Sequence, residues 1–348
     1  GNIHDDYGFS GKVINASINL SKNYNIKNLT TEITHTKDSG ANLFNIIINK
    51  GSLLDFELSN SAVRLKRLNN QTKVISSLRT SGKLNFSKIK KISSLFNLDL
   101  NIFNDIKGEV DLKTNINFEL NEKYKINNLN YSMEGESPYA EIYLKKKKII
   151  KEYFPLYDDK ITLKDSRIKF VNTKPNKTIE LNGLIKGNDY FDSYSLKHVY
   201  DAGTKKSSIS GIIDLTNSQV KVSQLNYEKD SGEKSEINFN FNFKLNKYYH
   251  INNLLFLSDK TKIDISNLVL NKNLETNDLE KIEVRTFKDK TKNNDFLIKK
   301  SKKVKISGEI FDAQPLLKSL YKKDKRKNFS KKFSSEIKVN FDKTITGT

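Results

Sequence analysis

Histidine, aspartate, glutamate and cysteine are the side chains that hold metals or carry acid–base chemistry, and this chain of 348 residues spaces them poorly for either purpose. No two of its four histidines stand at the spacing of metal ligands: His4, His35, His198 and His250. The pairs Asp5-Asp6 and Asp158-Asp159 would point to opposite faces of a strand or lie in an ordinary turn. The absence of cysteine excludes disulfides, cysteine–zinc sites and thiol nucleophiles. We therefore predict that the protein is not an enzyme and has no catalytic residue, bound metal or cofactor.

The chain is strongly basic, with 61 Lys and Arg residues against 41 Asp and Glu residues and a net charge of +20. Only six of the 61 basic residues are arginines, whereas surfaces built for nucleic acids favour Arg forks with interleaved aromatic rings. Abundant Lys, Asn and Ile are instead typical of an AT-rich genome, so we predict no nucleic-acid partner. The lysine-rich runs are 145–148, 299–305 and 322–332, and they either contact lipid headgroups or form solvated loops and protected strand edges.

The composition also limits how the chain can meet a membrane. The hydrophobic share is 36% and the mean hydropathy is −0.62. No apolar run is long enough to span a bilayer as a helix, which takes about 18 residues or more. The sequence opens on Gly1 without a methionine or a signal-like segment. We interpret it as an interior fragment whose membrane anchor or targeting segment would lie outside it.

One motif occurs three times. The pattern L-x-x-x-Y-x-I-x-N-L spans residues 20–29, 120–129 and 245–254, and the spacings of about 100 and 125 residues suit a module of several strands. We predict that each copy forms a turn or corner after a long strand, with the Tyr packed and the Asn bonded to its own backbone. Direct contact of the motif with a ligand is the alternative.

Strict alternation of apolar and polar residues leads into the motif copies and indicates antiparallel strands with one wet face. The clearest run is 237–245, where the odd positions are apolar and the even positions are Asn or Lys. Strands of ten to twelve residues would be about 35 Å long, at roughly 3.3 Å per residue. The apolar positions that we expect to line a common surface are Ile14, Ile18 and Leu20; Val110, Leu112, Ile116, Phe118 and Leu120; Ile237, Phe239, Phe241, Phe243 and Leu245; and, in a fourth run, Ile337, Val339 and Phe341.

A second recurrent element is Ser-Gly before a β-prone pair, at Ser81-Gly82, Ser210-Gly211 and Ser307-Gly308. We interpret each Ser-Gly as the start of a module. This divides the chain into a partial β module (1–80), a β module with a short helix near its start (81–209), a third β module (210–306) and the beginning of a further one (307–348).

Two short amphipathic helices are expected after these glycines. Ser87 is the predicted cap of the first, whose apolar stripe is Ile89, Ile92, Leu95 and Phe96. Asp312 is the predicted cap of the second, with Pro315 in the first turn, where its missing N–H costs little.

These patterns predict a mostly β protein, in which repeated long antiparallel strands form a curved, extended sheet with a few short amphipathic helices. Its apolar face is either the closed core of a sandwich or solenoid, or an open trough that holds lipid acyl chains. The stripes alone do not separate these arrangements. The long strands and the scarcity of helices to cover them favour the trough.

One segment resembles a known family. Residues 307–317, SGEIFDAQPLL, are similar to a G-x-x-[FL]-D-A-R-P-L-L stretch in alphaproteobacterial members of the AsmA-like superfamily of Gram-negative envelope proteins. The repeated long-strand modules with short helices between them also resemble this superfamily, and within it the large YhdP/TamB-type members. Gln314 stands where the family has Arg, which puts any charged contact made there in question.

The resemblance implies a bridge-like lipid-transfer protein in the periplasm, anchored in the inner membrane through a segment outside this chain. It implies a β-taco groove through which phospholipids move towards the outer membrane, with outer-membrane proteins as further partners and no cofactor. Two alternatives stay open. One is a structural or adhesin-like closed β protein, and the other is a basic protein that binds polyanions.

Overall fold

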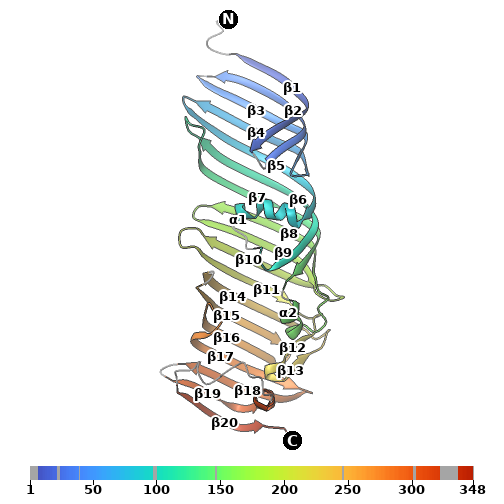
Figure 1. Cartoon of the computed structure of the whole chain (residues 1–348), viewed down its shortest axis with the longest axis vertical. Coiled ribbons are helices and arrows are strands. Elements are labelled where there is room, and N and C mark those ends of the chain that lie inside the picture. Colours follow the sequence, from blue (N-terminus) through green and yellow to red (C-terminus); the bar gives the residue numbers. More distant parts are fainter. Residues whose placement is uncertain are drawn as a thin grey trace. The chain divides into compact units, whose positions relative to one another are not determined.

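The structure is a computed structural model that describes residues 7–21, 24–38, 40–96, 100–145, 147–244, 247–300, 303–321 and 336–347. Within these ranges, eighteen strands belong to one hydrogen-bonded sheet, two short strands form a ribbon, and three short α-helices lie between strands. The predicted fold class, mostly β with long antiparallel strands and a few short helices, is confirmed. The chain divides into two compact units, residues 1–143 with 163–181 and residues 144–162 with 182–348. In each unit the sheet is open and curved (Figure 1).

Unit 1 is built from long strands and one helix. Its elements are β1 (Gly8–Ser21), β2 (Tyr24–Asp38), β3 (Ala41–Leu53), β4 (Phe56–Leu68), β5 (Gln71–Asn85), α1 (Phe86–Phe96), β6 (Phe103–Leu120), β7 (Ile126–Leu144) and β8 (Ile161–Thr173), followed by the first part of β9 (Asn176–Lys186). From β1 to β6, each strand pairs antiparallel with the next in the chain.

Unit 2 holds the remaining strands, the ribbon and two helices. Its elements are α2 (Lys147–Tyr153), β10 (Asp192–Asp201), β11 (Lys206–Asp214), β12 (Val220–Val222), the 3₁₀ turn η1 (Ser223–Leu225), β13 (Tyr227–Lys229), β14 (Ser235–Lys244), β15 (Tyr248–Ser258), β16 (Thr261–Asn271), β17 (Thr276–Lys288), β18 (Thr291–Lys300), β19 (Val304–Asp312), α3 (Gln314–Tyr321) and β20 (Ile337–Ile345). Antiparallel pairing joins β10, β11 and β14 to β19 in chain order. The last strand, β20, departs from the antiparallel expectation because it pairs parallel to β19.

Bulges, which we call creases, bend β1, β2 and β4 within their length. Asn15, Asn28 and Asn60 have φ angles of 53°, 52° and 43°, and the strand register shifts by one residue beside each of them. Asparagine adopts this left-handed conformation more readily than other residues with a side chain. An extra residue in one strand bends that strand and increases its twist. The bulges at these asparagines therefore bend β1, β2 and β4.

The Ser-Gly pairs lie inside β5, β11 and β19, shortly before the chain leaves the sheet for α1, the β12–β13 ribbon and α3. Glycine is needed at two of them for space. A Cβ at Gly211 would lie 2.6 Å from Cδ2 of Leu196 and 3.1 Å from Cζ of Phe239, and one at Gly308 would lie 2.8 Å from Cβ of Phe296. The boundaries proposed at 81, 210 and 307 thus fall within strands, and the modules remain a prediction about repeat units.

The two predicted helix caps have different outcomes. The backbone N–H of Lys88 donates to Oδ1 of Asn85 at 2.9 Å, so Asn85 caps α1. The prediction of Ser87 is wrong because the helix already begins at Phe86. Asp312 is confirmed as the cap of α3, since its Oδ1 accepts the backbone N–H of Gln314 at 3.0 Å.

Candidate functional site

One face of the unit 2 sheet is apolar from β10 to β20. Residues paired across neighbouring strands share a face, so the register identifies its members. We call this set the unit 2 apolar face: Leu196, His198 and Tyr200 of β10; Ile209 and Ile213 of β11; Ile237, Phe239, Phe241 and Phe243 of β14; Tyr249, Ile251, Leu254 and Phe256 of β15; Ile263, Ile265, Leu268 and Leu270 of β16; Leu279, Ile282 and Val284 of β17; Phe296 and Ile298 of β18; Ile306 of β19; and Val339 and Phe341 of β20.

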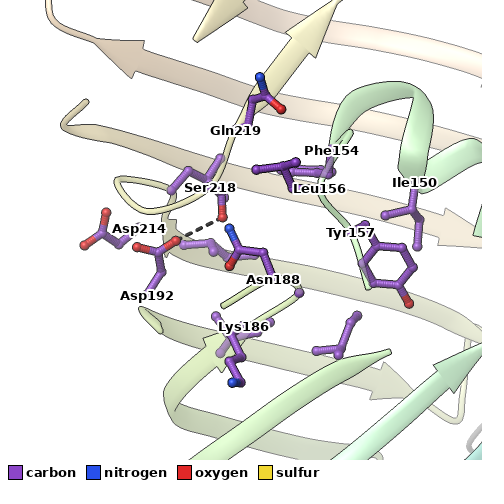
Figure 2. Close-up of a pocket in the computed structure, with 15 residues that line it drawn as sticks. Ile150, Phe154, Leu156, Tyr157, Lys186, Asn188, Asp192, Asp214, Ser218 and Gln219 are labelled. Atoms are coloured by element: carbon purple, nitrogen blue, oxygen red, sulfur yellow. Dashed lines mark hydrogen bonds between the residues drawn. The ribbon is translucent and has the colours of Figure 1, made fainter. Parts of the chain in front are cut away.

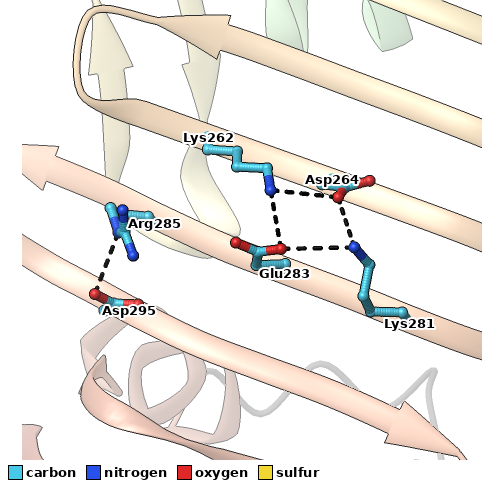
Figure 3. A network of polar contacts seen from close by, with 6 residues as sticks. All are labelled: Lys262, Asp264, Lys281, Glu283, Arg285 and Asp295. Atoms are coloured by element: carbon cyan, nitrogen blue, oxygen red, sulfur yellow. Dashed lines mark hydrogen bonds and ion pairs between the residues drawn. The ribbon is translucent and has the colours of Figure 1, made fainter.

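The opposite face of the same strands is polar and carries ion pairs (Figure 3). Nζ of Lys281 donates to Oδ2 of Asp264 at 2.7 Å, and Nζ of Lys262 donates to Oε2 of Glu283 at 2.9 Å. Partial burial opposes ionisation of Asp264, but the bonds and charges of the two lysines outweigh it and lower the pKa of its carboxyl. The sheet therefore has its ion pairs on one face and most of its apolar residues on the other, although Ile212, Leu255, Leu257, Val269 and Leu297 share the face with the ion pairs.

One edge of the unit 2 apolar face is covered by the segment that follows β11. Leu215, Val220 and Tyr227 form a buried cluster with Phe256, and Ile237 packs against it. The rings of Tyr227 and Phe256 meet edge to face with centroids 6.0 Å apart. This edge is thus a small closed core.

Polar side chains fix the cover in place. Nδ2 of Asn294 donates to the carbonyl of Leu225 at 2.8 Å, and its Oδ1 accepts the backbone N–H of Asp312 at 3.0 Å. Nδ2 of Asn226 donates to Oδ2 of Asp312 at 2.7 Å. Asp312 therefore caps α3 and also bonds to the residue that ends η1.

Away from the covered edge, most residues of the unit 2 apolar face are half-buried, whereas Leu279 is buried and Val339 is exposed. The rings of Phe239 and Phe241 stack with centroids 5.0 Å apart, and those of Phe243 and Tyr249 with centroids 6.5 Å apart. These rings leave part of their hydrocarbon surface in contact with water, which is unfavourable unless something apolar binds there.

Unit 1 has a comparable surface. The unit 1 apolar face comprises Phe9, Val13, Ala16 and Ile18 of β1; Ile26, Leu29 and Ile33 of β2; Phe44, Ile46 and Ile48 of β3; Leu58, Val63 and Leu65 of β4; Val74 and Leu78 of β5; and Val110, Leu112, Ile116, Phe118 and Leu120 of β6. Its centre is a core cluster, where Leu29, Ile48 and Leu58 are 3%, 5% and 1% exposed. On the other face, the guanidinium of Arg79 forms two hydrogen bonds with the carboxylate of Asp111, at 3.1 and 2.8 Å.

The residues predicted on β6 and β14 lie on these apolar faces. On β6, Val110 is buried and the other four, Leu112, Ile116, Phe118 and Leu120, are half-buried. On β14, Ile237, Phe239, Phe241 and Phe243 are half-buried. Leu245 lies outside the described residues. These residues are brought together in space within their own unit, and their role as a lipid surface remains a prediction.

The prediction for β1 is wrong at Ile14. The bulge at Asn15 leaves Val13 and Ala16 on the unit 1 apolar face. Ile14 therefore points to the other side and is 71% exposed. Reading an uninterrupted period of two through the bulge assigned this residue to the wrong face.

The remaining predicted residues are at the sheet margins. Ile18 lies on the unit 1 apolar face and is 43% exposed, whereas the side chain of Leu20 lies outside the described set. Ile337 and Val339 on β20 are 43% and 58% exposed. Phe341 is better packed, because its ring stacks on Phe311 with centroids 5.0 Å apart.

Most of both apolar faces was missed from the sequence, and β16 shows why. Ile263 and Ile265 alternate with polar residues, but Leu268 and Leu270 are one place out of step with them and have the apolar Val269 between them. Asn267 between the two pairs has a φ of 50°. The signal in the sequence was the distance of three residues, instead of two, from Ile265 to Leu268, with an asparagine between them. Recognising it as a bulge would have placed both pairs on one face.

The repeated motif forms the connection between two strands and then a crease. Asn28 and Asn128 have left-handed φ angles of 52° and 51°. Nδ2 of Asn128 donates to Oε2 of Glu119 at 2.8 Å, where a bond to its own backbone was predicted. Tyr124 is 68% exposed, so the predicted packing of the Tyr is wrong in the second copy, whereas Tyr249 stacks on the unit 2 apolar face in the third.

Two of the described histidines, His35 and His198, lie among apolar side chains. His35 lies among the rings of Tyr7, Phe9 and Phe44, with centroid distances of 5.4, 5.0 and 4.5 Å. His198 lies on the unit 2 apolar face, where burial lowers its pKa. In the ranges that the structure describes, no cluster of three or more metal-binding side chains is found. The helices in those ranges are too short or too polar to cross a bilayer.

Two lysines at the end of β18 and in the turn after it form ion pairs. Nζ of Lys300 donates to the carbonyl of Asn277 at 3.0 Å and pairs with Asp278 at 3.1 Å. Lys303 pairs with Glu336. The run 322–332 lies outside the described residues.

No protein-family model, curated protein or solved structure matches this chain. Its function has to be inferred from the apolar faces themselves.

Proposed function

We propose that the two apolar faces bind phospholipid acyl chains and conduct lipids between the inner and outer membranes of a Gram-negative envelope, without catalysis. The observation that carries this proposal is the half-exposed hydrocarbon of the unit 2 apolar face, backed by a face of ion pairs. A sheet of this kind is stable in water on one side only, and the other side favours an apolar occupant.

Acyl chains suit such a surface energetically. Each methylene removed from water contributes about 0.8 kcal/mol to the free energy of binding. This contribution does not depend on the orientation of the acyl chain on the surface. A chain lying across Phe239, Phe241 and Ile251 could shift to the next strand and keep a similar contact area. Binding without specific contacts is what movement along a surface requires.

The location and partners are part of the proposal. The resemblance of residues 307–317 to AsmA-like proteins supports a periplasmic position, an inner-membrane anchor outside this chain and outer-membrane proteins as further partners. Phospholipids are the ligand that this location supplies.

The closed-core alternative is less well supported. A sandwich would bury the rings of Phe241 and Phe243 under a second sheet. In the described residues, the covering segment lies at the edge near Leu215 and Tyr227. The rings of Phe241 and Phe243 are half-buried.

The test is mass spectrometry of lipids extracted from the purified chain, with a size-matched β protein from the same host as background. We expect Phe241→Asp to lower the bound phospholipid at least about tenfold, because a charge on the face opposes a hydrocarbon neighbour. Asn240→Asp on the opposite face of the same strand is the matched control and should keep the wild-type level. Unfolding of Phe241→Asp would identify a closed core, and wild-type lipid in that variant would remove the apolar face as the binding surface.

A further inference from the structure

Unit 2 contains a pocket of about 240 Å³ beside its apolar face (Figure 2). It lies between α2, the turn after β9 and the segment after β11, and hydrocarbon side chains line most of it: Ile150, Phe154, Leu156, Ile161, Ile185, Ile213 and Leu215. An apolar cavity of about 150 Å³ stays dry and holds a benzene molecule. This pocket is therefore large enough for a piece of a hydrocarbon chain.

The wall of the pocket is built by local hydrogen bonds. The backbone N–H of Phe154 donates to the carbonyl of Ile150 at 2.7 Å, and that of Tyr157 donates to Phe154 at 3.0 Å. The backbone N–H of Asp158 donates to the carbonyl of Gly187 at 2.6 Å. A Cβ at Gly187 would lie 3.0 Å from Cδ2 of Tyr157, so the glycine lets this ring close the wall. The wall of the pocket is therefore held in place by backbone hydrogen bonds and by the close approach of Tyr157 to Gly187.

The rim of the pocket carries carboxylates that are engaged in hydrogen bonds. Oδ1 and Oδ2 of Asp192 accept the backbone N–H of Asn217 at 2.9 Å and Oγ of Ser218 at 3.0 Å. Oδ1 of Asp214 accepts the backbone N–H of Thr216 at 2.9 Å. Lys186 lines the same pocket, so charges of both signs stand at the rim and a polar head remains in water there, whereas the lining behind them favours hydrocarbon.

We propose that this pocket binds the methyl end of a single linear hydrocarbon chain, with the polar head outside the carboxylate rim. Ile213 belongs both to the lining and to the unit 2 apolar face, so a chain held here lies at the edge of that face. The site goes beyond the proposed function, because it fixes one chain in a formed pocket. It does not depend on lipid movement along the face.

The test uses the whole chain and a fatty acid with a diazirine near its methyl end. After irradiation, peptide mass spectrometry should place the label within residues 150–161, 185–188 and 213–219. Excess unlabelled fatty acid should compete for the label. We expect Leu156→Asp, a change at a residue that is 56% exposed, to reduce labelling about tenfold.

Leu274→Asp is the matched control, because Leu274 is 67% exposed and lies in the turn between β16 and β17, away from the pocket. It should label like the wild type, and circular dichroism should show both variants folded. Equal labelling of the two variants, or wild-type label confined to β14–β18, would overturn the pocket. The wild-type map decides the question even if Leu156→Asp does not fold.

A second probe identifies the source of the chain. Phosphatidylglycerol vesicles that carry the same diazirine chain will label the pocket if one chain of a diacyl lipid enters it. Label from the fatty acid alone assigns the site to free single-chain amphiphiles. Phe241→Asp separates this proposal from the proposed function, because it should remove phospholipid from the apolar face and leave the pocket label in place.

Discussion

At the scale of single residues, two buried tyrosines of unit 2 differ in their hydroxyl groups. Oη of Tyr157 is buried and has no hydrogen-bond partner among the described residues, whereas Tyr227 forms hydrogen bonds with Ser258 and Thr261. A buried hydroxyl without a partner costs about 1–3 kcal/mol, and a hydrogen bond that is made contributes about 1 kcal/mol. In chemical denaturation we expect Tyr157→Phe to raise the free energy of unfolding by about 1 kcal/mol and Tyr227→Phe to lower it by a similar amount. A loss of stability in both variants would mean that the Tyr157 hydroxyl has a partner.

Also at the scale of residues, the burial of Lys229 in the segment that covers the unit 2 apolar face could not be predicted from the sequence. A lysine next to Asp230 in a polar turn is typically solvated, yet this side chain is fully buried. Its ammonium donates to the carbonyls of Thr216, Asp230 and Glu233 at 3.2, 2.7 and 2.9 Å. Burial lowers its pKa, against the opposing effect of nearby carboxylates. The backbone carbonyls that make this possible meet only in the folded chain.

At the scale of strands, the creases give the next prediction. Asn28 has a φ of 52° in β2, and a β-branched residue there costs roughly 1–2 kcal/mol. We expect Asn28→Val to lower the free energy of unfolding by about that amount. Asn28→Gly should stay close to the wild type. Asn45→Val, at an exposed and regular position of β3, is the control and should be neutral or mildly stabilising. Similar losses for the two valine variants would show that the crease is not strained by Val.

The creases also decide how far the sequence can be interpreted. The stripes of β6 and β14 were assigned correctly because their apolar residues alternate without an extra residue. The stripe of β1 failed at Ile14, and that of β16 was missed, because one asparagine in each strand reverses the alternation. The fold class needs only the dominant period of two. The membership of a face needs the position of every bulge, and that depends on pairing between strands.

At the scale of the whole molecule, each unit has ion pairs on one face of its sheet and mostly apolar residues on the other. A change of pH should therefore alter the charge of the two faces differently. Hydrogen bonds from Arg79, and the charge of that residue, lower the pKa of Asp111, and a hydrogen bond from Lys300 lowers that of Asp278. The pKa of Asp264 is lowered as well by Lys281 and Lys262, although burial of the carboxyl opposes this effect. Burial raises the pKa of Asp192 against its hydrogen bonds. Burial also lowers the pKa of His198 on the unit 2 apolar face.

The sign of the effect follows from these directions. A carboxyl with a lowered pKa stabilises the fold above its unfolded pKa, about 3.9 for Asp, and loses that contribution as the pH falls through the lower folded value. Asp192 acts in the opposite sense and favours the fold on acidification, but the lowered groups outnumber it among those named here. We expect the free energy of unfolding to decrease as the pH falls below about 6.5, the unfolded pKa of His, because the unfolded chain then binds a proton that His198 in the fold does not. It should decrease further below about pH 4, where the carboxyls of the unfolded chain bind protons, with a smaller fall in Asp264→Asn. Lipid bound to the unit 2 apolar face should be retained while His198, the histidine named on that face, is neutral. Release of lipid on acidification, from a chain that is still folded by circular dichroism, would indicate that protonation of His198 weakens the lipid contact.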